Sequence, residues 1–141
     1  LMPLYDHYVV IGARVRIDWN NQNAGNPAYV IGAVRDRATV STALNDYVEN
    51  GNVKYMTVGT ESGGNNVKSM YINVNPNRFL NRSKPMSDPD IKGTDSANPA
   101  EQCYLIVAAV STDEFTASNM TALVTIEYTA VLFEPKVLTP S

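Results

Sequence analysis

The side chains that commonly carry catalysis are scarce in this chain. His7 is the single histidine and Cys103 the single cysteine among 141 residues. A transition-metal site needs several imidazole or carboxylate ligands together, and a Ser-His or Cys-His nucleophile would depend on His7 alone. We therefore predict no catalytic residue, no cofactor and no enzymatic activity. His7 is expected in a structural or solvent-facing role, and Cys103 as a small buried hydrophobe of a strand.

A local basic group is formed by Arg78, Arg82 and Lys84. These residues lie in a polar segment, Pro76 to Glu101, that shows no hydrophobic periodicity. Cationic side chains grouped in this way are a candidate contact for nucleic-acid phosphates. The competing interpretation is a solvated loop, or a loop whose cations pair with carboxylates of a neighbouring subunit.

Acidic residues follow in the same segment. Asp88, Asp90 and Asp95 offer carboxylate oxygens, which are the ligands that a hard cation such as calcium prefers. Their spacing lacks the regularity of a dedicated calcium-binding loop. We therefore favour a solvated acidic loop and predict no metal site.

Composition indicates one globular domain without the excess of positive charge that nucleic-acid-binding proteins usually carry. The chain is 44% hydrophobic and 18% charged, with a net charge of −3 and no run of either sign. This balance excludes a disordered chain, and it lacks the basic stripe of a protein that neutralises phosphates. The longest apolar run, Tyr104 to Val110, is too short to cross a bilayer.

The hydrophobic pattern predicts an all-β fold, an antiparallel sandwich of two sheets. Period-two alternation between Gly, Asn and Pro turns is typical of such sandwiches. We expect one short helix at Ser41 to Glu49, covering an open end of the sandwich. The six expected strands are Tyr5–Trp19, Ala28–Arg35, Asn52–Val58, Val67–Asn75, Gln102–Ser111 and Met120–Lys136. The third and fourth strands are close enough to form a hairpin.

The alternation also assigns a buried face to the first and last strands. Charged residues such as Arg16 and Glu127 alternate with apolar ones and cannot face a dry core unpaired. We therefore expect the apolar set to lie between the sheets, together with Trp19 and most tyrosines. That set is Ile11, Val15, Ile17, Ile126 and Tyr128.

The segment Pro76 to Glu101 is longer than a simple connection requires. Its many Pro, Asp, Ser and Asn residues leave it unable to bury a core face. We expect it to be mostly exposed and to take part in subunit contacts or surface decoration. On this view, replacing Ser87 to Ala97 by a Gly-Ser linker leaves the melting temperature nearly unchanged.

The two ends of the chain carry a family resemblance. The stretches YDHYVVIGARVRIDWNN and VTIEYTAVLFEPKVLTPS resemble strands of the jelly-roll capsid proteins of circovirus-like viruses, which have small circular single-stranded DNA genomes and encode their own replication initiator. They are more distantly similar to the shell domain of tombusvirus-like RNA viruses. The anchors of the resemblance are Tyr5, Tyr8, Gly12, Asn20, Pro99, Tyr128 and Pro135.

The resemblance implies that residues 1–141 form a single jelly-roll capsid domain without an upstream basic arm and first strand. Six strands are two short of a full jelly roll, and we expect one more upstream of Leu1 and a weak one within Pro76 to Glu101. Copies of the chain would self-assemble into an icosahedral shell around single-stranded DNA, which the absent arm would contact. The implied location is the virion, with assembly in the host nucleus or cytoplasm.

The alternative interpretation is a non-viral β-sandwich that binds a carbohydrate or a receptor. Such a module uses an exposed aromatic platform, whereas Trp19 and most tyrosines lie at strand positions predicted to be buried.

Overall fold

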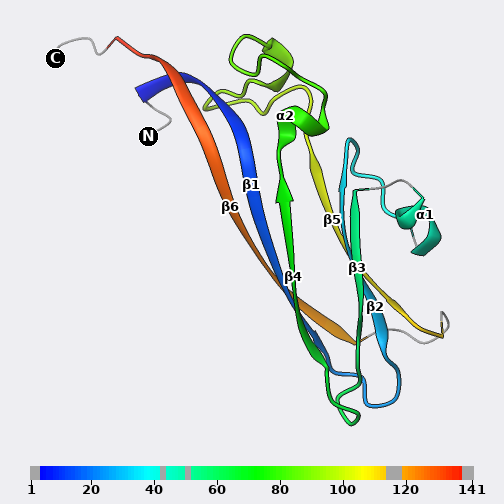
Figure 1. The fold of residues 1–141 in the computed structure, drawn as a ribbon. Coiled ribbons are helices and arrows are strands. Elements are labelled where there is room, and N and C mark those ends of the chain that lie inside the picture. Colours follow the sequence, from blue (N-terminus) through cyan, green and yellow to red (C-terminus); the bar gives the residue numbers. More distant parts are fainter. Residues whose placement is uncertain (1–3, 42–43, 50–51, 114–118, 138–141) are drawn as a thin grey trace.

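The computed structural model describes residues 4–41, 44–49, 52–113 and 119–137, which form two three-stranded antiparallel sheets (Figure 1). The first sheet has the order β4-β1-β6 and the second the order β3-β2-β5. The all-β, two-sheet prediction is confirmed. The strands are β1 (Tyr5–Asn21), β2 (Ala28–Arg35), β3 (Val53–Val58), β4 (Val67–Val74), β5 (Tyr104–Ser111) and β6 (Met120–Pro135).

The hydrophobic core lies between the sheets at the side where β4 faces β3, which we call the closed side. Apolar side chains from the first sheet meet those of the second there and exclude water. β2 is the central strand of the second sheet and is buried on both faces. Its inner face contributes Val30 and Val34 to the core between the sheets, and its outer face contributes Ile31 and Ala33 to a second apolar cluster. The buried core residues between the sheets are Val15, Ile17, Trp19, Val30, Val34, Val58, Met70 and Ile72.

Close approach of the sheets depends on Gly32 in β2. A Cβ at this position would lie 2.5 Å from Ile72 Cδ1 and 2.9 Å from Met70 Sδ. Contacts of that length are shorter than real Cβ contacts allow. The glycine therefore lets side chains of β4 and β1 reach the backbone of β2.

β3 and β4 do not form the predicted hairpin. β3 pairs with β2 in the second sheet and β4 pairs with β1 in the first, so residues 59–66 cross from one sheet to the other. The crossing is possible because Asn65 and Gly64 adopt positive φ angles, 58° and 76°, that turn the chain sharply. Both strands bury their apolar faces in the core, which a two-stranded hairpin alone could not achieve.

The predicted helix is present as α1 (Leu44–Val48) but does not cover an end of the sandwich. It lies on the outer face of the second sheet, where Tyr47 packs against Ile31, Ala33 and Ile106. The Tyr47 hydroxyl donates a hydrogen bond to the Ser41 carbonyl (2.7 Å). The predicted stop signal, Asn50-Gly51, lies outside the described residues.

The burial predicted for the last strand is wrong. β6 is the edge strand of the first sheet, and its residues 121–130 are exposed on both faces. Ile126 is 38% exposed and Tyr128 is 65% exposed, whereas Val15 and Ile17 are buried as predicted. The alternation is as expected, but β5, the strand of the second sheet on the same side as β6, diverges from it and does not cover it.

A bulge explains why Ile11 also departs from the predicted core. The register between β1 and β6 shifts between Val10 and Gly12, which leaves Ile11 as the extra residue and only partly buried. A bulge reverses the alternation on the strand that carries it. As a result Tyr8 and Val10, on the N-terminal side of the bulge, line the same side of the sheet as Ala13 and Val15.

The segment between β4 and β5 is docked on the sandwich, not merely exposed. It contains α2 (Pro76–Phe79) and a 3-10 turn at Pro89–Ile91, whose Ile91 is buried. Gly93 exchanges two 2.9 Å backbone hydrogen bonds with Tyr8 of β1. The weak strand expected here is reduced to this single bridge. Replacing Ser87 to Ala97 would therefore remove buried contacts and lower the melting temperature, contrary to the expectation above.

Within the described residues, no helix is long and apolar enough to span a membrane.

A pair of substitutions separates the buried strand from the edge strand. Ile17→Ala should lower the free energy of unfolding by about 2–5 kcal/mol, because it empties a fully buried site. Ile126→Ala, the matched change on β6, should cost about 1 kcal/mol or less because that side chain is already partly in water. Urea unfolding followed by circular dichroism measures both, and equal losses would contradict the edge position of β6.

Docking of the long segment is tested at Gly93. A Cβ there would lie 2.2 Å from Cζ of the Tyr8 ring, so Gly93→Ala must displace the ring or break the bridge. We expect faster hydrogen exchange at the amides of Tyr8 and Gly93, with the core of β2 unchanged. Gly25→Ala is the control, since nothing lies within 4 Å of its new methyl group. Unchanged exchange in Gly93→Ala would show that the segment is not held through this contact.

Candidate functional site

An open groove lies between the sheets, chiefly on the side where β5 and β6 form their edges. Its volume is about 560 Å³. Figure 1 shows why it exists: the two sheets diverge toward the end that carries α2 and the segment 76–101. We call it the intersheet groove. Residues of β1, β5, β6 and the segment before β5 line most of it, with one residue each from β2 and β4: Tyr8, Val10, Ala13, Val15, Val34, Val74, Pro76, Asn77, Leu80, Ile91, Asn98, Pro99, Glu101, Gln102, Cys103, Tyr104, Leu105, Ile126, Tyr128, Ala130 and Leu132.

The lining of the groove is chiefly apolar. The β6 wall presents Ile126, Tyr128, Ala130 and Leu132 from alternate positions of one strand. Concave surfaces lined mainly by apolar side chains, with few polar groups, are where proteins commonly bind ligands or partners. One polar atom stands out, since the Asn77 side-chain oxygen is buried and has no hydrogen-bond donor within the described structure.

Cys103 lies in the groove wall immediately before β5, an edge strand of the second sheet. It is half-buried, so the predicted full burial is only partly met. Desolvation by burial raises the pKa of the Cys103 thiol to about 11. Because the thiolate is the reactive form of cysteine, this thiol is protonated near neutral pH and a poor nucleophile.

His7 and Glu134 tie the start of β1 to the end of β6. The His7 ring and a Glu134 carboxylate oxygen lie 2.6 Å apart, and the ring stacks on Phe133 with centroids 5.7 Å apart. No second histidine exists in the chain. The predicted structural or solvent-facing role agrees with this partly exposed position.

Arg82 does not act as a free cation. Its guanidinium contacts Asp88 (3.1 Å), Asp90 (3.5 Å) and Glu101 (2.5 Å). The hydrogen bond with Glu101 is the largest cause of a raised pKa for Arg82. The centre formed by these four residues, which we call the Arg82 cluster, has one positive and three negative groups. It would repel a phosphate.

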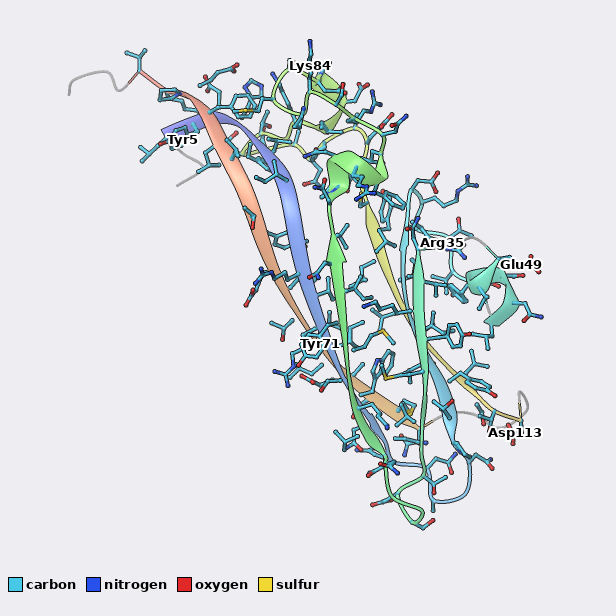
Figure 2. All side chains as sticks on the ribbon, in the orientation of Figure 1. Tyr5, Arg35, Glu49, Tyr71, Lys84 and Asp113 are labelled. Carbon is cyan, nitrogen blue, oxygen red and sulfur yellow. The ribbon has the colours of Figure 1, made fainter. Side chains whose placement is uncertain are left out.

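The other two predicted nucleic-acid contacts are not joined to Arg82 into a basic surface. Arg78, at the end of α2, and Lys84 are both exposed. Lys84 lies at the outer end of the segment and points away from the sandwich (Figure 2). The predicted basic group is therefore not a basic surface in the structure. Three carboxylates from later in the chain surround Arg82 and outweigh its positive charge.

The acidic residues of the segment are also engaged. Asp88 and Asp90 bind Arg82, and Asp95 lies 3.1 Å from the Lys136 ammonium after β6. Within the described parts of the chain, no group of three or more His, Cys, Asp or Glu side chains is placed to hold a metal ion. Asp88 and Asp90 therefore stabilise the segment internally, while Asp95 links it to the end of β6.

The outer face of the first sheet carries a polar network. Asp18 accepts hydrogen bonds from Ser69 Oγ (2.6 Å) and Arg16 Nε (3.0 Å), and these bonds lower the pKa of Asp18, the Ser69 bond most. The Arg16 guanidinium lies 5.9 Å from the centroid of the Tyr71 ring. This face is solvated and paired within itself, as expected for its charged residues.

The tyrosines do not form a buried set or an aromatic platform. Tyr47 is buried, but Tyr55, Tyr71 and Tyr128 are each more than half exposed, so the prediction that most are core residues is wrong. Tyr71 lies on the outer face of the first sheet beside Arg16, Tyr55 pairs with Ile31 on the other sheet, and Tyr128 lines the groove. They are dispersed over three surfaces.

Asn21 is a structural residue that the sequence analysis missed. Its side-chain amide is fully buried and donates to the carbonyls of Asn26 (3.0 Å) and Gly59 (2.8 Å), while its oxygen accepts from the Asn23 amide. It thereby fastens the β1–β2 loop to the β3–β4 crossing. An Asn at a strand end before a turn-rich stretch is the signal that points to such a role.

Comparison of the chain with protein-family models, with curated proteins and with solved structures finds no match.

A charge substitution tests the Arg82 cluster. Arg82→Gln should leave three carboxylates near one another without a cation, so the segment 76–101 should loosen and be cleaved several-fold faster by a protease. Lys84→Gln removes the same charge from an exposed neighbour and should have little effect. Limited proteolysis with mass spectrometry measures both, and equal cleavage rates would contradict a structural role for Arg82.

Proposed function

We propose that this chain is the shell domain of a viral capsid protein, and that its copies self-assemble into an icosahedral particle around a single-stranded DNA genome. The work of such a domain is structural, so no residue carries a reaction. The observation that supports the proposal most strongly is the order of the strands in the two sheets.

That order is the one expected for the last six strands of a jelly roll. In an eight-stranded jelly roll the third strand pairs with the sixth and the eighth, and the fourth pairs with the fifth and the seventh. Here β1 pairs with β4 and β6, and β2 pairs with β3 and β5. Numbering β1 as the third strand satisfies all four pairings. This numbering differs from the expectation above, which placed one of the two remaining strands within Pro76 to Glu101, where the described residues form a single bridge.

The surfaces favour association of copies over binding of a small ligand. The exposed aromatic residues are dispersed, which argues against the carbohydrate-binding alternative. The free strand edges and the apolar groove are instead surfaces that another polypeptide can cover. A closed particle uses one such set of contacts repeatedly, so a single gene product is sufficient.

On this proposal, the residues described above do not make the main contact with the genome. The net charge is −3, and Arg82 is neutralised by three carboxylates. Binding to nucleic acid by counterion release requires several unpaired cations on one face. The genome contact on this proposal is a basic arm, as the resemblance implies.

Assembly is the direct test. Purified chain should elute from size-exclusion chromatography well above the 15.4 kDa of a monomer and form rings or closed particles in electron micrographs. A monomer at every concentration and salt tested would contradict the shell proposal and favour a binding module.

The assignment of the genome contact has its own test. The chain should bind a single-stranded oligonucleotide with a Kd weaker than about 10⁻⁵ M at physiological salt, because few cations are available for phosphates. Fluorescence anisotropy measures the affinity. Micromolar or tighter binding with a steep salt dependence would place the genome contact on these 141 residues.

A further inference from the structure

The outer edge of β4 lies on the closed side of the sandwich and has no strand partner in the described part of the chain. β4 pairs with β1 along one edge only, and β3, which faces it on that side (Figure 1), belongs to the other sheet. One contact shows that a hydrogen-bond donor can reach this edge. The Lys54 ammonium, which extends from β3, donates to the Tyr71 backbone carbonyl at 2.7 Å.

β4 also exposes apolar surface next to this edge. Its side chains alternate, so Met70 and Ile72 are buried in the core while Val67 and Tyr71 are 61% and 58% exposed on the outer face of the sheet. Lys68, near the start of the strand, is its only charged residue. The rest of the strand therefore lacks the charged side chains that commonly prevent pairing at an edge.

We propose that β4 is a contact through which two copies of this chain associate, by antiparallel pairing of their β4 strands about a two-fold axis at Tyr71. The first sheet of each copy has three strands, so the pairing joins three and three into one continuous sheet of six. A two-fold contact of this kind uses the same surface on both copies. The inference rests on the proposed shell function only for its role, as one of the repeated contacts of the particle.

The alternation of β4 limits the registers that such a pair can take. Both copies must keep Met70 and Ile72 on the inner side of the joined sheet, and a shift by one residue would turn them outward. With Tyr71 on the axis, residues 68–74 of each copy are paired and Met70 lies opposite Ile72 of the partner copy. The two Tyr71 side chains then meet as an aromatic cross-strand pair, which stabilises antiparallel sheets.

Other registers of the same phase match the side chains less well. An axis at Met70 would set each Tyr71 opposite Ser69 and each Lys68 opposite Ile72, so polar and charged groups would face apolar ones. An axis at Lys68 would set two like charges directly opposite each other, which is destabilising. The register centred on Tyr71 avoids both.

Lys54 competes with this association. Residues that face each other in a hydrogen-bonded antiparallel pair exchange both of their N–H···O bonds, so each Tyr71 needs its carbonyl for the amide of the partner copy. In the single chain that carbonyl accepts the Lys54 bond. Because Lys54 is exposed, its ammonium can return to water at little cost. Lys54 therefore weakens the pairing without preventing it, as suits a reversible contact.

Single cysteines test the register. In a Cys103→Ser background, Tyr71→Cys places two thiols opposite each other, with Cα atoms about 5.5 Å apart, as a disulfide allows. Mild oxidation should link most of this variant into dimers. Ser69→Cys is the matched control on the same face of β4, and its thiols would lie about 13 Å apart along the pair. Equal or faster linking of Ser69→Cys would overturn the register.

Charge substitutions test the pairing itself, by sedimentation at concentrations below those of larger assemblies. The native chain should dimerise reversibly, and Tyr71→Lys should raise the dimer Kd about tenfold or more, because it sets two ammonium groups at the axis. Leu123→Lys adds the same charge to a 66% exposed site on the same face, two strands away on β6, and should leave the Kd within about twofold.

Lys54→Ala is the opposite test. It frees the Tyr71 carbonyl and should lower the dimer Kd about threefold or more. A chain that stays monomeric both in its native form and as Lys54→Ala would overturn the proposal. Equal effects of Tyr71→Lys and Leu123→Lys on the Kd would overturn it as well, because the loss would then follow from charge alone.

Further outcomes separate this inference from the shell proposal. Particles that form as readily from Tyr71→Lys as from the native chain would remove β4 from the contacts between copies and leave the shell in place. Dimers linked through position 71, without any larger assembly, would support the β4 contact and contradict the shell.

Discussion

The pairing of β1 with β6 is the interaction on which the rest of the structure depends. It joins the first and last strands of the chain from Tyr5 to Asn21, and it leaves only the other edge of β1 for β4. β4 is thereby placed over β3, where the core forms. β6 is displaced to the far edge with one apolar face uncovered, so the closed core and the open groove are two results of one pairing.

The sequence predicted the strands well because alternation is a local property. Ala28–Arg35 has the predicted bounds, and the remaining strands begin and end within about two residues of prediction. Alternation cannot distinguish a central strand from an edge strand. Val15 and Ile126 are register partners with the same pattern around them, yet one is buried and the other is exposed. Which edge is covered depends on the pairing of distant strands.

The candidate site shows the same limit in its charges. Arg78, Arg82 and Lys84 are close in sequence, and a net count of that stretch suggested a basic group. In space, Arg82 is surrounded by Asp88, Asp90 and Glu101. Glu101 lies 19 residues later in the chain and reaches Arg82 because the segment folds back on itself. The intersheet groove was not predictable from local patterns at all, since its walls come chiefly from β1, β5, β6 and the segment before β5, which are distant in the sequence.

The distribution of unsatisfied groups indicates what kind of surface this protein offers. The charged residues discussed above are largely paired within the chain, in the Arg82 cluster, the Asp95–Lys136 pair and the Asp18 network. Within the part of the chain that the structure describes, the outer backbone edges of β5 and β6 have no strand partner, and the apolar side chains between them remain partly exposed. Recognition at such a surface comes from main-chain hydrogen bonds and the phase of apolar alternation, with a small contribution from charge. The shell assembly that we propose requires contacts of that kind between copies of the sandwich.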